Sequence, residues 1–155
     1  MSQIDGGMER VDRFNKLLQV ANEQHTRCSK AWVVGGDIIY VESRKSAEIE
    51  LEDAKEDMQL SEELMKEASR FGTIVNMANI KSISKGARDW YSQVQNDNPC
   101  NISVALVVDS FYSRIIANFF LGFKNSRTIM KIFNEKDIAI EWLYEQLEIN
   151  KRVGG

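Results

Sequence analysis

Ser84 is the residue of this chain whose position most directly suggests chemistry. It follows a short apolar segment and precedes a run whose apolar spacing is typical of a helix. A serine at that place caps the free backbone N–H groups of the first turn. A phosphate on its hydroxyl would meet the same groups and the helix dipole, with Lys81 and Lys85 close in sequence. Two interpretations stay open, a capping serine and a phosphorylation or anion site.

A second group of polar residues lies where two predicted strands end. One part of it follows the apolar, β-branched run 102–108, and the other part ends the predicted strand 73–78. Open α/β sheets bind ligands at the carboxyl ends of their parallel strands. The alternative is that these residues cap the next helix and make a surface ion pair. The candidate ligand rim consists of Asn76, Asn79, Asp109, Ser110 and Arg114.

The segment 111–123 is apolar around most of its circumference. A helix of that kind has to be covered on more than one side, and a sheet covers only one. The remaining cover is the N-terminal helix, a second copy of the chain or an apolar ligand, unless packing within the chain is enough. The N-terminal helix offers Val11, Phe14 and Leu18. The predicted interface residues are Phe111, Tyr112, Ile115, Ile116, Phe119, Phe120 and Phe123.

The sequence shows no residue pattern that is typical of a catalytic site. His25 is the one histidine and lies in the N-terminal segment, whereas Cys100 lies in a polar loop without an obvious base. The glycines at 35 and 36 suit a hairpin, and Lys85-Gly86 lacks the spacing of a phosphate-binding loop. No His, Cys, Asp and Glu spacing is typical of a metal site. We therefore expect no enzyme, no cofactor and no metal.

Composition excludes several protein classes. The chain has 155 residues, of which 43% are hydrophobic, and these values suit one globular domain. Its formal net charge of -3 gives no sign of nucleic-acid binding. No apolar run reaches membrane-spanning length, and the charged N-terminus does not resemble a signal peptide. Cys28 and Cys100 show no disulfide or metal spacing. We expect a cytoplasmic protein.

The predicted elements alternate along the chain. A Gly35-Gly36-Asp37 turn joins two antiparallel strands, and the later strands are separated by helices, so they are predicted to be parallel. Gly72 is interpreted as the stop signal of the preceding helix. The fold class is therefore α/β, a mixed sheet of about five strands with an extra N-terminal helix. The predicted helices are 8–25, 51–68, one beginning at Ser84, 111–123 and one after Asn134. The predicted strands are 31–35, 38–44, 73–78, 102–108 and 128–133.

The last two strands and helices also carry a family resemblance. An A-L-V-x-D strand, a helix, a K-I-F strand and an A-I-E-W-L helix resemble the SpoIIAA-like group, classed with STAS domains and the CRAL-TRIO lipid carriers. The residues that carry this resemblance are Ala105, Leu106, Val107, Asp109, Arg114, Phe133, Ala139, Trp142 and Leu143. The likeness covers about residues 30–147 and implies a SpoIIAA-like/STAS-type domain over 30–150 with an N-terminal extension over 1–29.

The resemblance implies two functional classes. STAS domains are phosphorylated on a serine after the third core strand, and Ser84 is nearest that place, although no aspartate precedes it. We therefore expect a non-enzymatic interaction or regulatory module, with a protein partner or a homodimer formed through helix surfaces. The alternative is a carrier of a small apolar ligand, as the CRAL-TRIO likeness implies.

Overall fold

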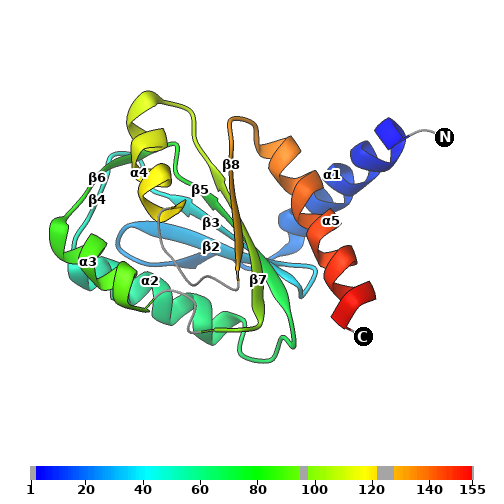
Figure 1. Ribbon diagram of the computed structural model, residues 1–155, viewed down its shortest axis with the longest axis horizontal. Coiled ribbons are helices and arrows are strands. Elements are labelled where there is room, and N and C mark those ends of the chain that lie inside the picture. Colours follow the sequence, from blue (N-terminus) through cyan, green and yellow to red (C-terminus); the bar gives the residue numbers. More distant parts are fainter. Residues whose placement is uncertain (1–2, 95–97, 122–127, 155) are drawn as a thin grey trace.

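The computed structural model describes residues 3–94, 98–121 and 128–154. Its helices are α1 (Gln3–Val20), α2 (Leu51–Leu64), α3 (Lys85–Val94), α4 (Phe111–Leu121) and α5 (Lys136–Gly154). Its strands are β1 (Gln24–His25), β2 (Ser29–Val34), β3 (Ile38–Ser43), β4 (Ala47–Ile49), β5 (Phe71–Asn76), β6 (Ile80–Ile83), β7 (Asn101–Val107) and β8 (Ile129–Phe133). Figure 1 shows the helices arranged on both sides of a twisted sheet.

The main sheet has the order β1-β2-β3-β5-β7-β8. Strands β1, β2 and β3 pair antiparallel, whereas β3, β5, β7 and β8 are parallel to one another. The predicted fold class, an antiparallel hairpin followed by parallel strands, is confirmed by this order. Gly35 and Gly36 form the hairpin turn at φ values of 66° and 83°, which residues with a Cβ adopt only under strain.

Helices α1 and α5 lie together on one face of the sheet, as Figure 1 shows at the right of the molecule. They enclose a filled core in which Phe14 of α1 is 0% exposed and its ring meets that of Tyr40 edge-on at 5.8 Å. Leu143 of α5 packs in the same cluster. Burying each large apolar side chain contributes roughly 1.5–3 kcal/mol. The N-terminal helix is therefore part of a core layer.

Helices α2, α3 and α4 cover the opposite face of the sheet (Figure 1). This arrangement excludes one of the covers considered for the segment 111–123, since α1 does not shield α4. Val11, Phe14 and Leu18 face α5 and the sheet instead. The physical reason is connectivity, because the hairpin that follows α1 leaves it next to β2 and α5. Amphipathic spacing predicts that a helix packs against a partner, but it does not predict which face of the sheet the helix covers.

Three strands, β1, β4 and β6, and several boundaries differ from the predictions. Strands β4 and β6 form a small parallel sheet of their own, with Ala47 and Ile49 buried and Glu48 exposed between them. A strand of three residues is too short for its alternation to be recognised. The N-terminal helix ends at Val20, and the residues after it include β1, which pairs with β2.

Gly72 lies inside β5 and does not end the preceding helix. A Cβ on it would lie 2.8 Å from Cδ1 of Leu143, so the absence of a side chain lets α5 approach the sheet. Glycine can end a helix, but it can also allow another element to pack closely against a strand, and the sequence does not distinguish the two roles. The helix itself ends earlier, at Leu64.

Candidate functional site

A cavity of about 480 Å³ lies between the sheet and helices α2, α3 and α4. Most of its wall is apolar, and it includes aromatic side chains from α3 and α4 and methionines from α2, from β8 and from the residue that follows β5. Ligand sites in proteins generally have roughly 300–1,000 Å³. The apolar wall includes Val41, Met58, Val75, Met77, Trp90, Tyr91, Leu106, Phe120 and Met130.

The central strands of the sheet position this cavity. Val41 of β3 and Val75 of β5 are register partners, and they are flanked in the sheet by β2 and β7. Residues in the middle of a covered sheet are normally enclosed, yet both valines are only half-buried. The layer of α2, α3 and α4 therefore leaves space over the sheet, whereas the layer of α1 and α5 fills its side.

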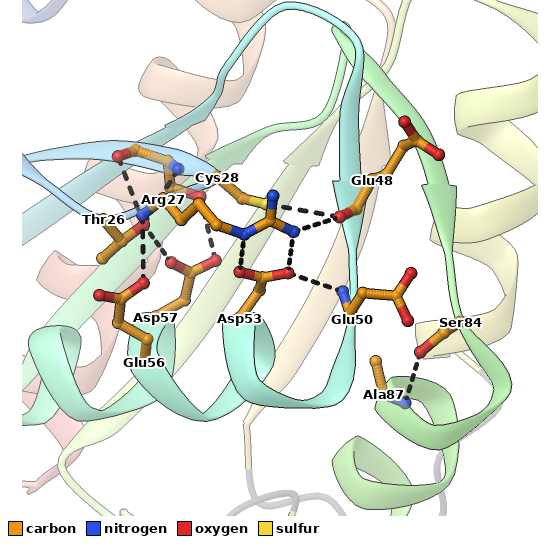
Figure 2. Close-up of polar contacts among 11 residues, drawn as sticks. Thr26, Arg27, Cys28, Glu48, Glu50, Asp53, Glu56, Asp57, Ser84 and Ala87 are labelled. Atoms are coloured by element: carbon orange, nitrogen blue, oxygen red, sulfur yellow. Dashed lines mark hydrogen bonds and ion pairs between the residues drawn. The ribbon is translucent and has the colours of Figure 1, made fainter.

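Asp57 supplies a carboxyl group at the cavity wall. It projects from α2 toward the loop between β1 and β2, where Thr26 Oγ1 donates to its Oδ1 at 2.5 Å (Figure 2). Ser29 Oγ donates to its Oδ2 at 3.0 Å. Each carboxylate oxygen accepts two hydrogen bonds, so each oxygen keeps one acceptor position for another donor.

Burial dominates the electrostatics of Asp57. It raises the pKa of this carboxyl above its usual range, although the hydrogen bonds from Thr26 and Ser29 act in the opposite direction. Burial likewise raises the pKa of Tyr91, and the negative charge of Asp57 adds to that shift. Among the described residues no salt bridge joins Asp57 to a cation. The carboxyl group therefore has hydrogen-bond donors but no charge partner.

A second polar group lies at the amino ends of the parallel strands. Thr73 Oγ1 donates to Asn101 Oδ1 at 3.0 Å, and Thr128 Oγ1 donates to the backbone oxygen of Asn101 at 2.7 Å. All three residues line the cavity. The site therefore combines a broad apolar wall with polar groups at separate places, which is the usual composition of a small-molecule site.

An ion-pair network lies beside Asp57 (Figure 2), and its residues do not line the cavity. Arg27 donates through Nε and Nη2 to the two oxygens of Asp53 at 2.6 and 2.5 Å, and it also binds the backbone oxygen of Glu48. These hydrogen bonds lower the pKa of Asp53. Burial raises the pKa of the adjacent Cys28 thiol to about 11, so this cysteine stays protonated at neutral pH and is a poor nucleophile. The network stabilises the start of α2.

Ser84 lies at the start of α3, where its Oγ accepts a hydrogen bond from the backbone N–H of Ala87 at 3.1 Å (Figure 2). The predicted capping role is confirmed, and the side chain is half-buried. The two candidate lysines have carboxylate partners, since Lys85 binds Asp89 at 2.8 Å and Lys81 lies 4.0 Å from Glu48. Neither lysine is joined to Ser84, and modification of the serine stays a prediction.

Four of the five predicted rim residues make hydrogen bonds to other parts of the fold. Asn76 Nδ2 donates to the hydroxyl of Tyr40, Asn79 Nδ2 donates to the backbone oxygen of Ser43, and Ser110 exchanges hydrogen bonds with Ser113. Arg114 binds the side-chain oxygen of Asn134. Asp109 is exposed. These five residues do not line the cavity, which lies between the sheet and helices α2, α3 and α4.

Helix α4 divides the predicted interface into two parts. Phe111 is 82% exposed, Ile115 50% and Tyr112 44%. Ile116 is buried, and the Phe120 ring meets that of Tyr91 at 5.2 Å beside the cavity. Phe119 is half-buried and stacks edge-on against Phe120, and Phe123 lies outside the described residues.

Sequence reasoning missed the cavity. Its strand residues have the alternation of any covered sheet, and Asp57 is one acid among many on α2. The methionines Met58, Met77 and Met130 were the available signal, since flexible thioether side chains are common at adaptable binding surfaces. They come from separate elements, so only folding brings them together.

The described residues contain no candidate metal site and no candidate membrane span. No group of three or more His, Cys, Asp or Glu in this part of the chain is placed to hold a metal ion. Within the same part, no helix has the length and hydropathy needed to cross a membrane.

Comparison with known proteins adds a family and a structural neighbour. Residues 31–147 match the model of a domain of unknown function, DUF7793. None of the curated proteins matches the chain. A similar solved structure is an uncharacterised protein of the DUF3478 family from Shewanella loihica PV-4, described as having a SpoIIAA-like fold. It is 13% identical, with a TM-score of 0.49 over 80% of this chain and 92% of that chain. Its description carries the fold name of the group that the sequence resembles.

Proposed function

The chain belongs to the DUF7793 family, a domain of unknown function, and from its own geometry we propose that it is a non-enzymatic binding module that carries a small, largely apolar molecule. The observation that supports this proposal is the cavity beneath the sheet. Its wall offers apolar contact over most of its area and a few hydrogen-bonding groups at its edges. These are the features by which proteins hold an apolar molecule and orient it.

The apolar wall favours an apolar occupant over water. Water inside a protein needs roughly two to four polar partners, and most of this wall offers none. An apolar molecule that covers the wall would remove its side chains from water, which contributes roughly 25 cal/mol per Å² of apolar surface.

Binding of N-phenyl-1-naphthylamine tests the proposal, because this neutral dye fluoresces strongly in an apolar environment. We expect it to bind the wild-type chain in a one-to-one ratio. The variant Val75→Phe places a larger side chain in the cavity and is expected to weaken binding while the chain stays folded. Phe111→Ser, on the exposed face of α4, is the matched control and is expected to leave binding unchanged. Binding that is lost in Phe111→Ser but kept in Val75→Phe would contradict the proposal.

A second candidate function is a protein-interaction module that forms a homodimer through α4. Phe111, Tyr112 and Ile115 share one exposed face, and such apolar patches on soluble proteins commonly mark interfaces. The helix carries a single charged residue, Arg114, which is bound to Asn134, so two copies can meet there with little charge repulsion. Light scattering across a concentration series tests it. We expect a dimer that Phe111→Ser with Ile115→Ser dissociates without a change in melting temperature. A monomer at all concentrations would exclude it.

A further inference from the structure

We propose that the cavity selects an organic cation, an apolar body that carries an ammonium group, with Asp57 as its charge partner. This inference rests on the proposed function and names the ligand class of the same site. It starts from the charges of the wall, where Asp57 and Glu62 are acidic and the described lining residues include no lysine, arginine or histidine. Among the described wall residues, a carboxylate ligand would therefore meet only like charges.

Asp57 is an unusual group in such a wall. Asp57 is half-buried, and carboxylates withdrawn from water are normally paired with a cation, because removing their charge from water is costly. The nearest arginine network satisfies Asp53, with Arg27 bound to both of its oxygens. From the residues that the structure describes, Asp57 receives the hydroxyl hydrogen bonds of Thr26 and Ser29 and no ion pair. The missing charge partner would be supplied by the molecule that fills the cavity.

The position of Asp57 suits an ammonium donor. One acceptor position remains on each of its oxygens, and an ammonium group provides three N–H donors. Thr26 and Ser29 hold the carboxyl group in place from the side of the β1–β2 loop, so its orientation does not depend on the ligand. Charge-assisted hydrogen bonds are roughly twice as strong as neutral ones.

Aromatic rings in the wall of the same cavity complete the site, and Tyr91 lies close enough to Asp57 for its charge to raise the pKa of the Tyr91 phenol. The rings of Trp90 and Tyr91 are 5.4 Å apart, those of Tyr91 and Phe120 are 5.2 Å apart, and all three residues line the cavity. The electron-rich faces of aromatic rings attract organic cations. An apolar cavity that combines a carboxylate with aromatic rings would bind a lipophilic cation more tightly than a fatty acid or an alcohol.

The test compares three probes that share an eight-carbon chain and differ in head group: octylammonium, 1-octanol and octanoate, measured by calorimetry at pH 7 below any micelle-forming concentration. We expect octylammonium to bind about tenfold more tightly than octanol, as a charge-assisted hydrogen bond implies, and octanoate to bind most weakly. This series uses the wild-type chain, so it does not depend on a variant that folds.

Variants then assign the preference to Asp57. In Asp57→Asn the affinities for octylammonium and octanol are expected to become equal within about threefold. The about tenfold preference of the wild-type chain corresponds to one charge-assisted hydrogen bond, which the variant cannot make. Glu63→Gln, on the outer side of α2 and paired with Lys66, is the matched control and is expected to keep the full preference. Thermal melting of both variants monitors folding.

The outcomes separate the two proposals. If octanol or octanoate binds as well as octylammonium, the cation inference is wrong, whereas the proposed carrier function stands. A preference that persists in Asp57→Asn also overturns the inference, because another group must then produce it. If none of the three probes binds and the naphthylamine dye fails too, both proposals are wrong.

Discussion

Val41 of β3 and Val75 of β5 are register partners in the middle of the sheet, and both side chains remain half-buried because the cavity lies against them. Their neighbours on the other face, Tyr40 and Ile74, are also register partners, but they are 1% and 0% exposed. One sheet therefore has a filled layer on one side and an unfilled layer on the other. Substitutions of equal size are expected to act in opposite directions on the two faces.

The first prediction compares one added methylene on each face. Val41→Ile extends into the cavity, where burial of a methylene contributes about 0.8 kcal/mol, so the free energy of unfolding is expected to rise by up to that amount. Val34→Ile makes the same change at a fully buried position of the filled core, where overpacking costs typically about 1–3 kcal/mol. Urea unfolding of the two variants measures the difference. Equal losses of stability would mean that no usable space lies over Val41.

The second prediction concerns the contact between β5 and α5. In Gly72→Ala the new Cβ would lie 2.8 Å from Leu143, and we expect a loss of about 1–3 kcal/mol in urea unfolding. Gly86→Ala is the control, because a Cβ there lies at ordinary distance from its neighbours, at 3.7 Å or more, in the exposed first turn of α3. It is expected to be neutral or stabilising, since alanine is a better helix former.

Shortening Leu143 provides a second check on this contact. Leu143→Ala alone is expected to cost about 2–5 kcal/mol, as for other buried leucines. In that background Gly72→Ala is expected to cost much less than in the wild-type chain, because the leucine atoms that obstruct the Cβ are absent. Additive costs would show that the strain at Gly72 has another source.

The third prediction is the pH dependence that Asp53 produces. Arg27 lowers the folded-state pKa of Asp53, so its stabilising effect is fully present above the unfolded value of about 3.9 and is lost as pH falls through the lower, folded pKa. Asp53 also accepts a hydrogen bond from the backbone N–H of Glu50, which caps α2. Asp53→Ala is therefore expected to cost about 1 kcal/mol at pH 7. Stability measured from pH 7 to pH 2 is expected to show the variant and the wild type converging in acid.

The fourth prediction is a pH dependence of opposite sign at Asp57. Burial raises its folded-state pKa, so protonation favours the folded chain, and this contribution is present at low pH and lost as pH rises through the folded pKa. Relative to Asp57→Asn, the wild-type chain without ligand is expected to lose stability as pH increases from 4 to 7. Unfolding curves of both chains at several pH values measure this slope. A wild type that gains stability over that range, relative to the variant, would mean that the folded-state pKa is lowered.

Much of the architecture could be predicted because it depends on local chemistry. The Gly35-Gly36 turn needs positive φ, the run over β7 is apolar and β-branched throughout, and Ser84 precedes an amphipathic helix. Each of these signals lies within a few neighbouring residues. Hairpin, parallel strands and helix start were therefore predicted correctly, whereas Gly72 was misread because its reason, Leu143, lies on another element.

The candidate site could not be predicted in the same way. Asp57 shares its helix with many solvent-facing acids, and only the packing of α2 against β2 brings Thr26 and Ser29 to its oxygens. Of the predicted rim residues, Ser110 finds its hydrogen-bond partner, Ser113, three positions along the chain, whereas Asn76 and Asn79 bind residues 36 positions away.

The sequence by itself determined the alternation of strands and helices, and with it the antiparallel hairpin and the parallel sheet, because hydrophobic periodicity and turn chemistry are local properties. Tertiary structure alone decided which face each helix covers and how completely. Helix α1 packs against α5 rather than α4, and the layer opposite them leaves a cavity over Val41 and Val75. The physical reason is that a filled layer and a hollow one have the same apolar pattern, and differ only in the volumes that meet across the sheet.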